Sequence, residues 1–376
     1  MFKPDTAARL GRNALAAAEQ FGPIAEVLDV PQRIADRVFE KLRTAPVEDY
    51  RIDFEDGYGY RADAEEDAHA VASARALREG MIAGTLPAFI GMRVKPLTPE
   101  LRNRSIRTLD LFLRELGAPV PPNFAITLPK PTTREEPAAL ADRLDALESE
   151  IGIAPGTIRI EVMIETPQAF LDPTGASNLP KFAAAGRGRV RGAHFGPFDY
   201  TSSIGIAGNA QDLLHPACDM ARHMMQIAYM PLGIWISDGP TTVMPVARER
   251  GAAGVHDAWR LHFRNVRHAL RMGYYQGWDL HPAQLVTRYA AVYSFYDEAM
   301  DSASRRLKNF VDQAAQATMV GQTFDDAATG QGLLNFFLRA IHCGAITEEE
   351  AGQRTGLTHD EINAASFTEI TKSRLR

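Results

Sequence analysis

Residues 51–59 read R-I-D-F-E-D-G-Y-G, and they place three carboxylates, Asp53, Glu55 and Asp56, at the end of a segment typical of a buried strand. A protein normally keeps unpaired acids out of its interior, because burying a charge without a partner costs several kcal/mol. A glycine turn follows directly. The stretch therefore predicts a strand whose end carries acids that have partners or a task.

Similar short apolar runs that end in polar or turn residues recur along the chain. They are Tyr50 to Asp56, Pro87 to Lys95, Phe124 to Lys130, Ile158 to Glu165, Val190 to Gly196, Leu232 to Ser237 and Trp278 to His281. Between most of them lie segments rich in Ala, Arg, Glu and Leu, so the pattern predicts an α/β fold with a parallel sheet covered by helices. Seven strands over about 250 residues favour a TIM (β/α)8-type barrel. An open doubly wound sheet is the alternative, and residues 23–31 are where we expect the eighth strand.

The pattern changes after about residue 300, where the segments are helical in periodicity and carry no strand signal. We therefore expect a barrel domain over residues 1–300 and an all-helical C-terminal extension over residues 301–376. Residues 346–362 have the rhythm of a helix-turn-helix, which leaves transcriptional regulation as one alternative. Their acidic first helix argues against contact with phosphates, so packing or oligomerisation is the favoured role of this extension.

Composition excludes several classes of protein. The chain has 376 residues, 45% of them hydrophobic, and a formal net charge of −6, which makes a nucleic-acid partner unlikely. Its two cysteines, Cys218 and Cys343, are far apart, so neither a disulfide scaffold nor a structural zinc site is expected. No apolar run suits a signal peptide or a membrane span. We expect a cytoplasmic protein without a membrane partner.

Polar residues stand at the ends of five of the predicted strands, and in a barrel these ends meet at the rim where catalytic groups lie. They are Glu55 and Asp56, Arg93 and Lys95, Lys130, Glu165, and Asp199. Any one of these acids could simply cap the next helix. Taken together, with basic residues among the acids, they favour a functional site.

The run I-E-V-M-I-E at 160–165 sharpens this prediction, because side chains alternate across a strand. Ile160, Val162 and Ile164 share one face, which suits packing against helices. Glu161 and Glu165 share the other face and should point into the barrel. Two inward glutamates need partners, and a cation is the simplest one.

The ordered motifs resemble those of the citrate lyase beta-subunit-like proteins in the HpcH/HpaI aldolase superfamily. The matching segments are D-F-E-D-G at 53–57, R-V-K at 93–95, L-P-K at 128–130, I-E-T at 164–166, G-P-F-D-Y at 196–200 and W-D-L-H-P-A-Q-L at 278–285. The stretch from I-E-T to F-D-Y also resembles malate synthase. Members of both groups bind magnesium and make or break C–C bonds through an enolate.

The resemblance implies an Mg²⁺ site, or a Mn²⁺ site, with Glu165 and Asp199 as metal ligands. It further implies that Glu55 and Asp56 hold metal-bound waters and that Arg93 faces the oxyanion of the substrate. The substrate would be a small-molecule 2-oxo acid or an acyl-coenzyme A thioester, and the relatives are commonly homo-oligomers. The chemistry of Mg²⁺, which prefers a few carboxylates with waters and substrate oxygens, agrees with this assignment.

Lys130 is a further expected substrate-binding residue because it ends a strand on the same rim. His281 is a candidate for the same role, although Pro282 after it equally suits the start of a helix. The true aldolases of the superfamily carry a histidine near the position of Asp56, and this sequence does not. The general base is therefore unassigned. A malate synthase-like condensing enzyme and a non-catalytic carboxylate-binding subunit remain the alternatives to a magnesium-dependent C–C lyase.

Overall fold

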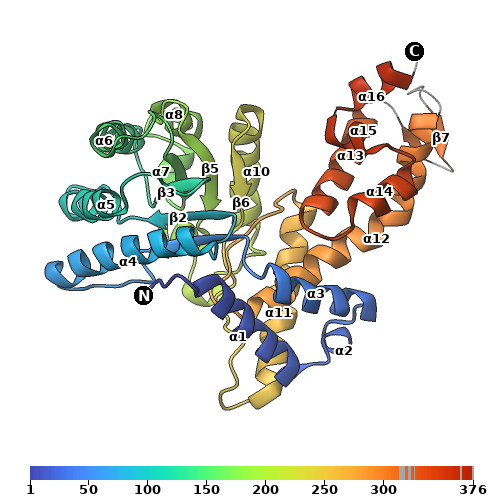
Figure 1. Cartoon of the computed structure of the whole chain (residues 1–376), viewed down its shortest axis with the longest axis horizontal. Coiled ribbons are helices and arrows are strands. Elements are labelled where there is room, and N and C mark those ends of the chain that lie inside the picture. Colours follow the sequence, from blue (N-terminus) through green and yellow to red (C-terminus); the bar gives the residue numbers. More distant parts are fainter. Residues whose placement is uncertain (313–317, 321–322, 326, 365, 375–376) are drawn as a thin grey trace. The chain divides into compact units, whose positions relative to one another are not determined.

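The computed structural model describes residues 1–312, 318–320, 323–325, 327–364 and 366–374 (Figure 1). These residues form two compact units. Unit 1 consists of residues 1–21 and 42–286, and unit 2 consists of residues 22–41 and 287–376.

Unit 1 is built on a six-stranded parallel sheet. Its strands are β1 (Asp49–Asp53), β2 (Phe89–Arg93), β3 (Phe124–Leu128), β4 (Arg159–Ile164), β5 (Val190–Phe195) and β6 (Trp235–Ser237), in that spatial order. A doubly wound sheet reverses its strand order at a switch point, so the sequential order argues against that alternative. The sheet is curled. The evidence is that the rings of Phe89 on β2 and Trp235 on β6 lie only 5.6 Å apart across its concave face. The result is a half-barrel.

Two strand predictions are wrong. Residues 278–281 form no strand, and this region contributes a single parallel bridge between Asp238 and Gly277. Residues 23–31 contain the short helix α2 (Ile24–Leu28) instead of an eighth strand. Both segments are short apolar runs, whose length and periodicity do not separate a strand from a helix or a loop. A complete eight-stranded barrel is therefore not seen in the described part of the chain.

Helices alternate with the strands and cover the convex face of the sheet, as Figure 1 shows for α4, α5, α6, α8 and α10. The helices of unit 1 are α1 (Thr6–Phe21), α4 (Asp63–Ala83), α5 (Arg102–Leu116), α6 (Glu135–Ile151), α7 (Pro167–Phe170), α8 (Leu179–Ala185), α9 (Pro197–Ser203), α10 (Pro216–Tyr229) and α11 (Gly251–Arg271), with 3-10 turns η1 (Gly208–Ala210) and η2 (Met230–Leu232). The predicted α/β class is confirmed.

The two faces of the sheet differ in chemistry. On β4, Ile160, Val162 and Ile164 are completely buried and belong to the main apolar core, together with Leu113 of α5 and Leu144 of α6. This confirms that the aliphatic face of the strand packs against helices. The opposite, concave face carries the polar and charged side chains of the strands, and it continues into the strand ends.

Unit 2 contains α2, most of α3 (Gln32–Thr44), the greater part of α12 (Gln284–Asp312), α13 (Ala327–His342), α14 (Glu348–Thr355), α15 (His359–Ala364) and α16 (Phe367–Arg374). The ion pair between Arg33 and Asp297, at 2.5 Å, links α3 to α12 within this unit. The prediction of an all-helical extension is wrong at one place, because β7 (Thr318–Val320) and β8 (Thr323–Asp325) form an antiparallel pair. Such three-residue strands are too short to show a periodicity of two. Among the described helices, none has both the length and the apolar composition that crossing a membrane requires.

The assignment of the core can be tested on β3. Ile126 is fully buried between the sheet and its helices, so Ile126→Ala should lower the free energy of unfolding by about 2–5 kcal/mol. Ile82 of α4 is 83% exposed, and Ile82→Ala should change the free energy of unfolding by less than about 0.5 kcal/mol. Urea denaturation followed by circular dichroism measures both. Equal costs for the two variants would contradict the assigned packing.

Candidate functional site

The acidic turn after β1 is held by its own carboxylates. Asp53 accepts hydrogen bonds from the backbone amides of Glu55 and Gly57, both at 2.9 Å, and the Glu55 carboxylate accepts one from the amide of Asp56 at 2.8 Å. A Cβ at position 57 would lie 2.6 Å from a carboxylate oxygen of Asp53. The turn therefore needs glycine at that position, and its acids are fixed in direction.

Arg93, at the end of β2, is the first cationic partner of these acids. It lies opposite Asp53 in the strand register and binds its carboxylate through two hydrogen bonds, from Nε at 2.7 Å and from Nη2 at 2.6 Å. Its Nη1 is 3.1 Å from Glu55 Oε2. The guanidinium also lies 5.3 Å from the centroid of the Trp278 ring. Arg93 is thereby held in one orientation by charge and by stacking.

Sequence reasoning assigned no role to Asp53, yet Asp53 is the residue that fixes Arg93. The available signal was its spacing of two residues from Glu55, which puts both on one face of the strand. What the sequence does not reveal is the register with β2, which brings Asp53 opposite Arg93.

Lys130, just after β3, connects the remaining predicted residues. Its Nζ lies 2.6 Å from Glu55 Oε1, 3.2 Å from Asp56 Oδ2 and 3.5 Å from Asp199 Oδ2. Its backbone amide donates to Glu165 Oε1 at 2.8 Å. The structure therefore brings Glu55, Asp56, Arg93, Lys130, Glu165 and Asp199 together at the carboxyl ends of β1 to β5, as the strand-end pattern predicts.

The backbone of Lys130 is itself in an uncommon conformation. Its φ of 51° lies in the left-handed region, which costs a residue with a side chain of this size about 1–3 kcal/mol. The hydrogen bond from the Lys130 backbone amide to Glu165 and the ion pairs of Nζ offset this cost. Strain of this kind tends to gather at functional sites.

The electrostatics of the cluster show an excess of negative charge. Burial raises the pKa of Glu165 from its ordinary 4.5 to about 8, against the effect of Lys130 and with further contributions from Asp199 and Glu55. Burial also raises the pKa of Glu55, although Lys130 and Arg93 act in the opposite direction. Burial alone would lower the pKa of Lys130, but Glu165, Glu55 and Asp199 raise it above its ordinary value.

Glu165 and Asp199 are the two residues that the sequence predicts as metal ligands. Glu165 is 2% exposed and packs so closely on the next strand end that a Cβ at Gly196 would lie 2.4 Å from its Oε2. Asp199 lies in the first turn of α9 and keeps its side chain 45% exposed. Within the described residues, no cluster of three or more His, Cys, Asp or Glu side chains is arranged to hold a metal. Mg²⁺ usually takes only one or two protein carboxylates and completes its octahedron with waters and substrate oxygens, so this pair fits the ion.

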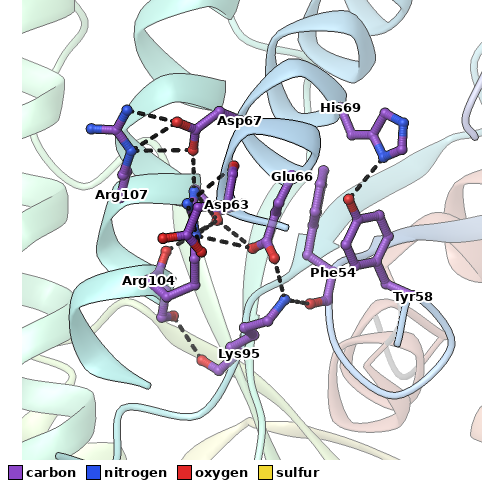
Figure 2. A network of polar contacts seen from close by, with 11 residues as sticks. Phe54, Tyr58, Asp63, Glu66, Asp67, His69, Lys95, Arg104 and Arg107 are labelled. Atoms are coloured by element: carbon purple, nitrogen blue, oxygen red, sulfur yellow. Dashed lines mark hydrogen bonds and ion pairs between the residues drawn. The ribbon is translucent and has the colours of Figure 1, made fainter. Parts of the chain in front are cut away.

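Lys95 supports the acidic turn through the backbone carbonyl of Phe54 (Figure 2). Its Nζ donates to the carbonyl oxygen of Phe54 and to Glu66 Oε2 of α4, both at 2.7 Å. Glu66 is 1% exposed and accepts a further bond from Thr108 of α5 at 2.6 Å. Phe54 stands between Asp53 and Glu55, so this buried network fixes the carbonyl in the middle of the turn. The sequence suggested Lys95 as a rim residue but did not show this supporting role.

Glu161 lies on the same face of β4 as Glu165, and its partners include two arginines and a histidine. Arg51 binds Glu161 Oε2 at 2.5 Å, Arg191 binds Oε1 at 3.1 Å and His194 lies 3.0 Å from Oε2. The glutamate is 3% exposed. Burial alone would raise its pKa, but Arg51, His194 and Arg191 bring it well below the ordinary value. The expectation of a cationic partner therefore holds for Glu161 without a metal ion.

His281 is not joined to the hydrogen-bonded cluster in the described part of the chain. Its ring accepts a hydrogen bond from the amide of Ala283 at 3.2 Å, and its own amide donates to Gln284 Oε1 at 3.1 Å. These contacts belong to the start of α12. Burial lowers the pKa of its imidazole. Of the two readings that the sequence left open, the helix start is the one that these contacts describe.

Comparison with known proteins places the chain in a family. A family described as a domain of unknown function (DUF6986) matches residues 1–370. None of the curated proteins matches the chain.

Solved structures share the fold. A citrate lyase from Burkholderia xenovorans LB400 is 22% identical, with a TM-score of 0.65, over 86% of this chain and 92% of that one. CitE from Mycobacterium tuberculosis, in complex with magnesium, acetoacetate and coenzyme A, is 16% identical, with a TM-score of 0.54, over 81% and 95%. A Haloferax volcanii malate synthase is 18% identical, with a TM-score of 0.52, over 90% and 94%. The predicted resemblance to the citrate lyase and malate synthase group is thus confirmed at the level of the fold.

The support from Lys95 can be tested by its removal. Lys95→Met removes the ammonium partner of the buried Glu66 and leaves it Arg104, at 3.4 Å, as a cationic partner, so the free energy of unfolding should fall by roughly 1–3 kcal/mol. Lys95→Met/Glu66→Gln removes the buried negative charge as well and should regain part of this loss. Urea denaturation measures both variants. A cost below about 1 kcal/mol for Lys95→Met would show that the contact does not hold the turn.

The pKa of Glu165 predicts a pH dependence for the metal-free protein. The folded chain keeps the Glu165 proton up to a pH of about 8, whereas the unfolded chain releases it near 4.5. The folded state thus binds more protons in this window, and the contribution of Glu165 to stability falls as the pH rises from about 4.5 to 8.

The measurement is urea denaturation of wild type and Glu165→Gln in the presence of a chelator at several pH values. The variant lacks the titrating group, so its stability relative to wild type should increase across the window. A constant difference between the two proteins would contradict the raised pKa.

Proposed function

The chain belongs to the DUF6986 family, and we propose that it is a magnesium-dependent enzyme that makes or breaks a carbon–carbon bond through an enolate. The proposed substrate is a 2-oxo acid or an acyl-coenzyme A thioester. The catalytic part lies within residues 1–300, because every carboxylate of the cluster comes from the half-barrel strands or their ends.

The observation that carries this proposal is the excess of carboxylates at the strand ends. Asp53, Glu55, Asp56, Glu165 and Asp199 gather there. Two cationic side chains, Arg93 and Lys130, contact them. Burial is the main cause of the raised pKa of Glu165, and the neighbouring carboxylates of Asp199 and Glu55 raise it further. A divalent cation at Glu165 and Asp199 would relieve the excess of negative charge, with Mn²⁺ able to replace Mg²⁺.

Such an ion supplies Lewis-acid polarisation of a carbonyl group. The side chains of the protein would do the rest. Arg93 would bind the carboxylate or the developing oxyanion of the substrate, because it stays charged and its donors are pre-oriented by Asp53 and Glu55. Glu55 and Asp56 would orient waters at the metal site, and Lys130 would hold both acids in place and bind the substrate.

The structural neighbours support the substrate class. The CitE structure contains magnesium, acetoacetate and coenzyme A. Magnesium and coenzyme A are the cation and the thioester carrier of this proposal, and acetoacetate is a small oxo acid, with its keto group at C3 instead of C2. The malate synthase neighbour favours the same chemistry in the condensing direction as a second candidate. At identities of 16% and 18%, these neighbours support the chemistry only through the fold, and the choice of substrate rests on the test below.

The test is hydrogen exchange at the donor carbon. The purified protein is incubated with pyruvate, and separately with acetyl-coenzyme A, in D₂O with Mg²⁺, and proton NMR follows the loss of the methyl signal. We expect metal-dependent exchange with one of the donors. Asp199→Asn and Glu165→Gln should abolish it, whereas Glu150→Gln, at the far end of α6, should leave it unchanged.

Full metal-dependent exchange in either ligand variant would overturn the metal assignment. No exchange by wild type with either donor would overturn the proposed enolate chemistry for these two substrate classes. Mn²⁺ binding followed by electron paramagnetic resonance provides a readout of the site that does not depend on turnover.

A further inference from the structure

Glu161, His194 and Ser237 form a chain of hydrogen bonds across three neighbouring strands of the concave face. His194 Nε2 lies 3.0 Å from Glu161 Oε2, and His194 Nδ1 lies 2.5 Å from Ser237 Oγ. All three side chains are buried, with 3% of Glu161, 8% of His194 and 3% of Ser237 exposed. They come from β4, β5 and β6, and the backbone register sets His194 opposite Ser237.

The surroundings of Glu161 determine which nitrogen of His194 carries the proton. Glu161 accepts hydrogen bonds from Arg51, Arg191 and Thr127. Arg51, Arg191 and His194 hold the pKa of Glu161 well below the ordinary value. An ionised carboxylate can only accept, so Nε2 of His194 must carry a hydrogen. In the neutral imidazole, Nδ1 is then a free acceptor, and it receives the hydroxyl hydrogen of Ser237.

This arrangement does more than neutralise a buried acid. Arg51 and Arg191 already match the charge of Glu161, so His194 is not required for that purpose. A hydroxyl aligned on a base, with the base oriented by a carboxylate, is the geometry that activates an oxygen for proton transfer.

The chain also lies next to the candidate site. The Trp278 ring is 5.3 Å from the ring of His194 and 5.3 Å from the guanidinium of Arg93. Met163 stands opposite His194 in the register and receives a contact from Arg93 Nη1 at 3.5 Å. Arg93 is 7% exposed and His194 is 8% exposed, so both retain a small accessible part.

We infer that Ser237 and His194 are the proton acceptor for the carbon acid, with Glu161 as the group that positions His194. This inference rests on the proposed function, and it assigns the general base that the sequence left open.

The proton on the carbon next to the carbonyl moves to Ser237 Oγ, while the hydroxyl proton of Ser237 moves to His194 Nδ1. The C–H electron pair becomes the double bond of the enolate, and the carbonyl oxygen takes the negative charge near Arg93. The imidazolium that results lies against the carboxylate of Glu161. In the cleaving direction, the same pair donates a proton to the enolate carbon. In the condensing direction, the enolate carbon bonds to the electrophile, and the proton held by His194 passes through Ser237 to the alkoxide that forms.

The experiment compares His194→Gln and Ser237→Ala with wild type in the D₂O exchange assay. A glutamine amide can donate to Glu161 and accept from Ser237, so His194→Gln keeps the hydrogen bonds but cannot take up a proton. We expect exchange to fall by at least about 100-fold in both variants, since a positioned base contributes roughly 10²–10⁴-fold. Mn²⁺ affinity and thermal stability of His194→Gln should match wild type. His268→Gln, which changes a histidine paired with Asp219 on α10, is the matched control and should exchange normally.

Exchange by His194→Gln at more than about a tenth of the wild-type rate would overturn the inference and leave the proposed function standing. No exchange by wild type would instead remove the proposed function on which it rests. Asp199→Asn changes a proposed metal ligand and should lose Mn²⁺ binding. This loss distinguishes it from His194→Gln and Ser237→Ala.

Discussion

The ion pair between Arg93 and Asp53 is the contact on which the other interactions of the site depend. It joins β1 to β2 through two short hydrogen bonds, and the same Asp53 carboxylate organises the turn that carries Glu55 and Asp56. Arg93 then contacts Glu55, and Glu55 contacts Lys130. A continuous path of charged groups therefore crosses the strand ends. Each member has its direction set by its neighbour, because a bidentate guanidinium–carboxylate pair restricts the angle as well as the distance.

Such a path is not explained by stability. Desolvating buried ion pairs commonly costs as much as their attraction returns, so an apolar replacement of similar volume is often neutral or stabilising. The convex face of the same sheet shows that this chain builds an apolar core where stability is the only requirement, with Ile126, Val162 and Leu144 all completely buried. The concave face and the strand ends carry charge instead, and the strained backbone of Lys130 adds a further cost. The charges lie at the carboxyl ends of the strands, which is where barrel-type sheets carry their active-site residues.

The sequence predicted the parts of the fold that are decided locally. On β4, the periodicity of two separated the aliphatic face from the glutamates. The polar residues at the ends of the apolar runs located the cluster. Both features can be recognised from neighbouring residues in the sequence. The predictions that were wrong, at residues 23–31 and 278–281, concern short segments in which an apolar run suits a helix, a loop or a strand equally well. The roles of Asp53 and Lys95 were missed for a different reason. Asp53 depends on Arg93, 40 residues away, and Lys95 depends on Glu66, 29 residues away. Such pairs are set by strand register and helix packing that one sequence does not display.

The two glutamates of β4 show how the same strand can serve two purposes. Glu161 and Glu165 share one face and are both nearly inaccessible to solvent, at 3% and 2%, yet their pKa values shift in opposite directions. Burial raises both, so the difference comes from their partners. Glu161 is surrounded by Arg51, Arg191 and His194 and remains an ionised acceptor, which suits it to orient an imidazole. Glu165 faces other carboxylates and receives one backbone amide and the field of Lys130, which leaves it short of positive charge. A chain that needed only to neutralise its interior would treat both glutamates alike. The contrast between them distinguishes a fixed internal network at Glu161 from the metal site that we propose at Glu165.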